Sequence, residues 1–375
     1  MVARRSRKTA PKNEVVRPAV IPIPSAPGHG WPVWGHDATV ADLRGVIAAG
    51  RVRHAYLLAG PAGTGKRTLA TAFAQALTCL APLTPGVPCG VCRSCGKIAR
   101  GVHPDVQRVS LESQAATAEK ANRQNTSLTI ETIREVTSLA TLRPMESDWR
   151  VTMIDDAESM QGVAQEALLK TLEEPPGYLV LILLSDDAEA LLPTIRSRCE
   201  VVELRPVARA TTTALLEATG VAADEAATLA GLAGGRPGWA VAAARDRSLI
   251  ERQQASVDRG LAWIGASSYD RLVTALRIGD GFTKQREETY ADLLTVLGLW
   301  RDALLLLADR PDYVTYRVGV DTLSRWVPGW DLSDISRAIR SVQTGIADLE
   351  SNVRPRLALE NMVLQWPTPD SPPTR

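Results

Sequence analysis

The stretch HAYLLAGPAGTGKRTL, residues 54–69, joins a short apolar run to a glycine-rich turn and then to a segment without helix breakers. We expect a buried strand, a loop and a helix in that order. The turn follows the phosphate-loop pattern G-x-x-x-x-G-K, in which backbone N–H groups surround phosphates at the start of a helix. A chance glycine loop is the alternative. The residues predicted to bind nucleotide here are Gly60, Gly63, Thr64, Gly65 and Lys66.

The next position departs from the pattern. In a working phosphate loop a Ser or Thr hydroxyl follows the lysine and holds Mg²⁺, whereas this chain has Arg67. A guanidinium has no lone pair to offer a metal. Thr68 does not replace the hydroxyl, because one step along a helix turns the side chain by about 100°. We therefore expect Arg67 and Thr68 to border a site that binds ATP or ADP weakly, with an impaired Mg²⁺ site.

An acidic pair follows a second apolar run, RVTMI, at Asp155 and Asp156. A strand followed by Asp is the Walker B arrangement, in which the first acid reaches the Mg²⁺ shell and the second, normally Glu, polarises water. Asp156 is one methylene shorter than Glu, and a misplacement of about 1 Å costs roughly a hundredfold in rate. The pair is thus predicted to be a degenerate catalytic element. The alternative is that the two acids cap the following helix.

Apolar runs alternate with helical patterns up to about residue 205, which predicts an α/β domain with a parallel sheet. The polar segment 111–127 has little to bury and is predicted to be a loop. Beyond residue 205 only helical patterns remain. The predicted parts are a disordered basic, Pro-rich tail (1–32), the α/β domain (33–205), a small helical lid domain (206–248), an all-helical C-terminal domain (249–366) and a second disordered tail (367–375).

Four cysteines, Cys79, Cys89, Cys92 and Cys95, have the spacing C-x₉-C-x₂-C-x₂-C. Thiols this close together in a cytosolic chain favour a closed tetrahedral Zn²⁺ site over disulfides. Because four protein ligands leave no open position for water, the zinc would be structural. Unbound cysteines or a redox pair are the alternatives. This zinc module, 79–95, lies inside the α/β domain.

The bulk composition gives no sign of a membrane or polyanion protein. The 375 residues carry 43 Lys and Arg against 42 Asp and Glu, so the net charge is +1. No run of eighteen apolar residues occurs, and the first residues lack the apolar core of a secretory signal. We expect a cytoplasmic protein with no membrane partner. The basic residues of the tail contact nucleic acid or are simply solvated.

The segment TIRSRC, 194–199, places two arginines before the strand CEVVEL. Its composition alone indicates surface ion pairs. In combination with the other motifs, however, the chain resembles the bacterial sliding-clamp loader family, the AAA+ proteins of the DNA polymerase III holoenzyme. The resemblance covers about residues 33–366. Its main segments are VWGHDATVADLRGVIAAGRVRHAYLLAGPAGTGK, the four cysteines with HPD, IDDAESMQGVAQEALLKTLEEPP and LLPTIRSRC.

The resemblance implies roles for three further residues. Arg198, in the Ser-Arg-Cys motif, would be a trans arginine finger that reaches the ATP of a neighbouring subunit, and such fingers contribute about 10³–10⁵ in rate. Ser185 matches the sensor-1 position, and Arg236 falls near sensor 2. The C-terminal helices would form part of a collar that joins the subunits.

Within that family, Arg67, Asp156 and the short segment after residue 366 favour the delta-prime type, whose own nucleotide site decays. The alternative is the gamma/tau type, an ATPase that keeps Lys-Thr and Asp-Glu; an unrelated P-loop enzyme such as a nucleotide kinase is a more distant one. The implied partners are gamma/tau and delta subunits in a hetero-pentamer, the β sliding clamp, and primed DNA through the complex. The chain itself would hydrolyse ATP poorly or not at all.

Overall fold

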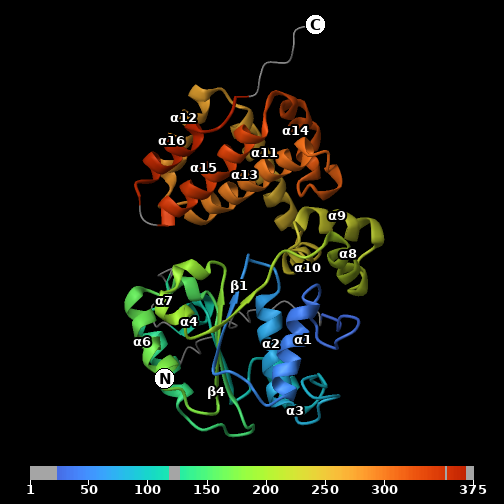
Figure 1. Ribbon diagram of the computed structural model, residues 1–375, viewed down its shortest axis with the longest axis vertical. Coiled ribbons are helices and arrows are strands. Elements are labelled where there is room, and N and C mark those ends of the chain that lie inside the picture. The colour runs from blue at the N-terminus through green and yellow to red at the C-terminus, as the bar shows by residue number, and fades with distance from the viewer. Residues whose placement is uncertain (1–22, 118–126, 351–352, 369–375) are drawn as a thin grey trace, which may run out of the picture.

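The computed structural model describes residues 23–117, 127–350 and 353–368. Figure 1 shows an α/β part that contains the sheet, a small group of helices beside its upper end, and a larger helical part above both. The predicted fold class, an α/β domain with a parallel sheet followed by a helical lid and a helical C-terminal region, is confirmed.

The sheet consists of five parallel strands in the order β2-β3-β4-β1-β5. The carboxyl ends of β3, β4 and β1 therefore meet at one edge, where open α/β sheets bind ligands. Ala59 of β1 pairs with Ser185 of β4. The strands are β1 (Ala55–Ala59), β2 (Val106–Val109), β3 (Arg150–Ile154), β4 (Leu179–Ser185) and β5 (Glu200–Glu203).

Helices cover both faces of this sheet (Figure 1). Alternate residues of the central strands enter two separate hydrophobic clusters, so that Met153 packs on one face and Ile154 on the other. This is why β4 is apolar at every position from Leu179 to Leu184. On the first face lie α1 (Asp37–Ala48), α2 (Lys66–Thr78) and α3 (Arg93–Ala99), and on the second α4 (Leu111–Thr117), α5 (Ile130–Ala140), α6 (Gly162–Glu173) and α7 (Pro193–Arg196).

The remaining helices form two further hydrophobic clusters. The smaller one joins α8 (Arg209–Ala218), α9 (Ala223–Ala233) and α10 (Pro237–Ala243). The larger one joins α11 (Arg247–Gly265), α12 (Ser268–Gly281), α13 (Arg286–Leu307), α14 (Val320–Trp326), α15 (Leu332–Glu350) and α16 (Pro355–Leu364). Short 3₁₀ turns occur at η1 (Ala157–Ser159), η2 (Ala188–Ala190), η3 (Pro311–Tyr313), η4 (Arg317–Gly319) and η5 (Val327–Gly329). None of the helices that the structure describes is both long and apolar enough to cross a membrane.

The predicted tails are too long at both inner ends. Residues 1–22 and 369–375 lie outside the described residues. Trp31, however, is fully buried, and the centroid of its ring lies 6.4 Å from that of the Phe73 ring. Its indole N–H donates to the carbonyl of Gly86. At the other end, Trp330 donates to the carbonyl of Thr368. The prediction of disorder was therefore wrong for residues 23–32 and 367–368, because distant side chains provide their packing partners.

The predicted loop 111–127 was also wrong in its first part, which forms α4. The Ser110 hydroxyl accepts the N–H of Ser113 and so caps the first turn. Leu111 packs against the second sheet cluster, and the Gln114 amide donates to the carbonyl of Ser127. Residues 118–126 lie outside the described part of the chain. One half-buried leucine and local capping are enough here to form a short helix in a polar segment.

Candidate nucleotide site, metal centre and arginine motif

The phosphate loop connects β1 to α2, as the pattern predicts. Gly65 precedes the helix, and Gly60, Gly63 and Gly65 all have positive φ (145°, 81° and 107°), a region that other residues rarely adopt. A Cβ at Gly60 would lie 2.1 Å from the carbonyl oxygen of Leu204. Thr64 is fully buried, and its hydroxyl donates to the carbonyl of Pro61. The glycines therefore let the chain turn tightly against the sheet.

Lys66 is buried and its ammonium is bound within the protein. Nζ lies 2.5 Å from Oδ1 of Asp186, donates to the carbonyl of Pro61 at 3.1 Å, and also donates to the carbonyl of Gly60. An ammonium has three N–H donors. All three are directed at these protein acceptors, so the lysine as placed has no donor left for a phosphate.

Arg67 contacts the acid predicted to hold the metal. Its Nε lies 2.9 Å from Oδ2 of Asp155, and Nε of Arg108 lies 3.7 Å from the same oxygen. Asp155 is only 2% exposed; burial raises the pKa of its carboxyl, while the two guanidiniums oppose that rise. Thr68 is half-buried one position further along α2. With Lys66 and Asp155 both engaged, these residues do not fit a Mg²⁺–nucleotide complex as they stand.

The second acid of the predicted Walker B pair points elsewhere. Asp156 has a φ of +55°, and its Oδ2 accepts the N–H of Leu111 at 3.3 Å. The structure thus brings Asp155, and not Asp156, beside Arg67. Glu158, which the sequence analysis missed, lies in η1, and burial raises the pKa of its carboxyl while its own backbone N–H opposes that rise. Its only signal in the sequence is a third acid in IDDAES.

The two predicted sensor residues lie near the loop but have protein partners. Ser185 ends β4, is fully buried, and donates its hydroxyl to the carbonyl of Asp187 at 2.7 Å. Arg236 immediately precedes α10, and its Nε donates to the carbonyl of Ala233 at 2.9 Å. The backbone N–H of Gly238 donates to the carbonyl of Gly63 at 2.8 Å. The lid helix therefore contacts the phosphate loop through its backbone.

Arg198 lies between α7 and β5, on the face of the sheet away from α2. Its side chain is 36% exposed. One terminal nitrogen lies 2.8 Å from Oε1 of Glu173, at the end of α6, and the other donates to the carbonyl of Thr194 at 3.0 Å. The side chain is thus held on two sides at the surface and makes these contacts away from its own phosphate loop.

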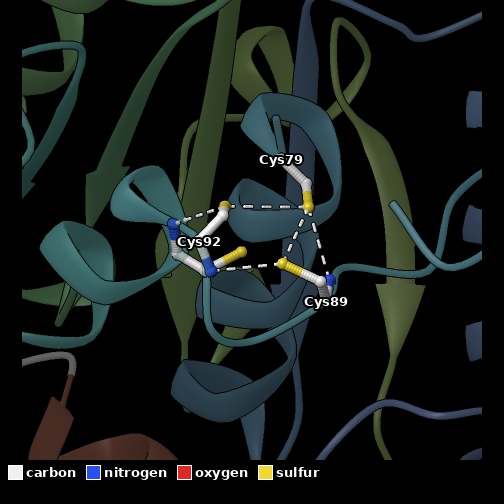
Figure 2. A group of neighbouring side chains, drawn as sticks. Cys79, Cys89 and Cys92 are labelled. Carbon is white, nitrogen blue, oxygen red and sulfur yellow. Dashed lines mark hydrogen bonds between the residues drawn. The ribbon is translucent and has the colours of Figure 1, made fainter. Parts of the chain in front are cut away.

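The four predicted metal ligands converge, and Figure 2 shows three of them, Cys79, Cys89 and Cys92, pointing toward one another. Their sulfur atoms all lie within 4.8 Å of one another, with Cys79 Sγ 3.6 Å from that of Cys89 and 4.0 Å from that of Cys92. Tetrahedral zinc with Zn–S bonds of about 2.3 Å separates its sulfurs by about 3.8 Å. All four are free thiols, so the donor set fits one tetrahedral ion.

Backbone N–H groups point at these sulfurs. The N–H of Cys89 donates to Cys79 Sγ at 3.3 Å and that of Cys92 to Cys89 Sγ at 3.2 Å. Burial works against ionisation of Cys92, but the N–H groups of Cys95 and Leu80 and the neighbouring thiols outweigh it and lower its pKa to about 6. The thiolate is the form that binds metals. Burial instead raises the pKa of the Cys79 and Cys95 thiols, so a bound cation would have to take the place of their protons.

The comparisons with known proteins agree with the motifs. A family model described as DNA polymerase III, delta subunit, matches residues 35–208. The DNA polymerase III subunit gamma/tau of Mycobacterium tuberculosis is 28% identical over 357 residues, which is 88% of this chain and 59% of that protein. The delta' subunit of Pseudomonas aeruginosa is 41% identical over 146 residues, 39% of this chain and 41% of that protein.

Among solved structures, a DNA polymerase III gamma subunit-related protein from Thermotoga maritima covers 87% of the chain, and the chain covers 97% of it, at 17% identity and a TM-score of 0.34. The chain spans about 59% of the length of the gamma/tau relatives. In sequence and in the motifs placed above, the chain is thus similar to the gamma/tau and delta-prime subunits of DNA polymerase III.

Proposed function

We propose that the chain is a delta-prime-type subunit of the DNA polymerase III clamp loader. In this role it assembles with gamma/tau and delta subunits into a hetero-pentamer that loads the β sliding clamp onto primed DNA. The observation that carries the proposal is the ion pair between Arg67 and Asp155 at 2.9 Å. A subunit with a guanidinium in contact with its metal-binding acid is a poor ATPase, whereas it can still act on a neighbour's ATP.

Arg198 is the group with which it would act. The guanidinium is partly exposed, and its contacts with Glu173 and Thr194 give it a defined direction at the surface. An arginine presented in this way can stabilise the charge that develops on a transferred phosphoryl group in an adjoining subunit. Asp155 and Asp156 are then remnants of a catalytic pair. Ser185 and Arg236 keep the positions of the two sensor residues, beside a site that binds nucleotide weakly.

The other parts have supporting roles in this proposal. The four cysteines hold a structural Zn²⁺, since four protein thiolates leave no position for a substrate. The helical part over 249–366 forms the collar that joins the subunits, and deletion of residues 249–375 should abolish co-assembly. The lid and α/β domains take the limits predicted above, except that the α/β domain extends back to residue 23. Residual binding of ATP or ADP is weak and without a well-held Mg²⁺.

The alternative is a gamma/tau-type ATPase subunit. It is favoured by one observation, namely that the similarity to gamma/tau extends over 88% of the chain, against 39% for the delta' relative. In that case Lys66 would bind ATP for turnover in this chain. The two functions therefore differ in which residue the complex needs.

The test is the DNA- and clamp-stimulated ATPase activity of the reconstituted complex, with single substitutions in this chain. Arg198→Ala should lower the rate of ATP turnover at the neighbouring site by about 10³-fold or more. Lys66→Ala should leave that rate unchanged. Arg198→Lys is the matched control, because it keeps the charge and loses the forked geometry. Gel filtration of each complex shows whether assembly is intact.

Two results would reject the delta-prime role. Loss of turnover with Lys66→Ala, or turnover by the isolated chain, would identify a working ATPase of the gamma/tau type. Full activity of an intact complex with Arg198→Ala would show that this arginine does not act in trans.

A further inference from the structure

We infer that Asp186 takes the place of a phosphate at Lys66, so that this carboxylate sets the affinity of the chain for nucleotides. The inference rests on the proposed silent site and deepens it. The loss of the metal-binding hydroxyl at Arg67 explains poor hydrolysis, but it does not by itself prevent binding. A carboxylate of the protein that pairs with the Lys66 ammonium does oppose binding, because it competes with the phosphate.

The sheet itself puts Asp186 in this position. Ser185 of β4 pairs with Ala59 of β1, and the N–H of Gly60 donates to the carbonyl of Ser185 at 3.1 Å. Asp186 therefore follows β4 directly beside the start of the phosphate loop. Its Oδ1 reaches Lys66 Nζ at 2.5 Å, although the two residues are 120 positions apart. The contact is a consequence of strand register and does not depend on a loose loop.

The charge balance at Lys66 requires a counter-ion. The lysine side chain is only 9% exposed, and a buried ammonium is costly unless it is paired and hydrogen-bonded. Of the nearby acids, Asp155 is paired with Arg67 and Arg108, and the Glu158 carboxyl lies against Ser185 and Asp186. Asp186 is thus the anion that neutralises Lys66. The other two N–H groups of the ammonium donate hydrogen bonds to the carbonyls of Gly60 and Pro61.

A nucleotide would have to displace this carboxylate. The Asp186 side chain is 48% exposed, so it can turn into solvent once an incoming phosphate pairs with Lys66. Binding then exchanges one anion for another at the same ammonium, and the affinity falls by the strength of the pair that is broken. Because Arg67 keeps its own pair with Asp155, the exchange does not involve Mg²⁺. The ligand class is a nucleoside polyphosphate bound through Lys66 without a divalent cation.

The experiment is isothermal titration of ADP and ATP into the full-length chain, in Mg²⁺ and again in a chelator. Asp186→Asn should tighten binding by at least about tenfold, the change expected from loss of one charge-assisted pair. The gain should be the same with and without Mg²⁺. Asp186→Ser, which has a shorter side chain, should show the same gain and guards against an effect of the amide.

Asp187→Asn is the matched control. It removes the same charge one residue further on, and the amide oxygen retains the ability to accept the N–H of Glu189, as Oδ1 of Asp187 does. This variant should bind as the wild type does. Adding Lys66→Ala to Asp186→Asn should remove the gain, because the phosphate then has no ammonium to pair with.

Several outcomes would overturn the inference. These are unchanged or weaker binding by both Asp186 variants, an equal gain in Asp187→Asn, or a gain that survives Lys66→Ala. Its failure can be told from failure of the proposed function, because Arg198→Ala in the assembled complex tests the trans role independently. Tighter binding by Asp186→Asn with no effect of Arg198→Ala would retain this inference and reject the delta-prime role.

Discussion

The four-cysteine cluster and the phosphate loop are both short motifs with the correct spacing, yet they differ in whether their ligand-binding atoms are free. The thiols of Cys79, Cys89 and Cys92 contact one another and backbone N–H groups, and they lack a cationic partner among their hydrogen bonds. In the phosphate loop, Lys66 and its neighbour Arg67 each have an acidic partner from another strand end. A motif thus shows which atoms can converge. Whether a ligand can bind to those atoms depends on whether charged side chains of the protein already pair with them.

The physical origin of the difference is the distance in sequence between partners. All four cysteines lie within 79–95, around the junction of α2 and α3, so local chain geometry brings them together. The partners of the phosphate loop follow β3 and β4 and are placed by the sheet. The predictions below test this contrast, from the largest expected effect to the smallest.

Removing one cysteine should have the largest effect. Cys92→Ser should reduce bound zinc from about one ion per chain to nearly none, and should lower the melting temperature by roughly 5–10 °C, because a structural metal contributes folding free energy. Mass spectrometry of the metal and a thermal melt measure both. Cys199→Ser is the control, since Cys199 is a free thiol outside the cluster. Zinc retained at full occupancy by Cys92→Ser would contradict a four-thiolate site.

Restoring the hydroxyl in the phosphate loop should have an intermediate effect. Arg67→Thr removes the closer of the two guanidiniums at Asp155 and supplies the missing metal ligand. Mg²⁺ should therefore tighten ATP binding by about tenfold in this variant and leave ATP binding by the wild type unchanged. Titration in Mg²⁺ and in a chelator measures the ratio. Arg67→Ala removes the guanidinium without adding a hydroxyl and should show a smaller ratio. A wild-type chain whose ATP affinity already depends on Mg²⁺ would show that Arg67 does not block the metal.

The smallest effect is on stability and its dependence on pH. Burial raises the pKa of Asp155 above its ordinary value of 3.8. A raised folded pKa means that this group's contribution is present below the unfolded pKa and lost as pH rises through the folded value. Asp155→Asn cannot ionise, so it should melt about 2–4 °C above the wild type at pH 7, with the difference shrinking toward pH 4. A lower melting temperature at pH 7 would mean that the pairs with Arg67 and Arg108 outweigh burial.

Where prediction from the sequence failed, the missing information was a distant partner. Trp31 was assigned to a disordered tail because its partners, Phe73 and Gly86, lie more than forty residues away. Asp156 was assigned, as the water-polarising acid, to a degenerate catalytic pair with Asp155, but its positive φ turns the carboxylate toward α4. Adjacent letters in a sequence do not specify which way each side chain faces after a strand ends.

The sequence by itself determined the α/β class, the family resemblance and the candidate ligand sets, because apolar periodicity, glycine spacing and cysteine spacing act over short stretches of chain. Tertiary structure alone decided that Asp186 neutralises Lys66, that Arg67 and Arg108 share Asp155, and that Glu173 holds Arg198. Each of these pairs joins residues from different elements. Their charges meet only after strand register and helix packing have set the distance between them, and Coulomb energy depends on that distance.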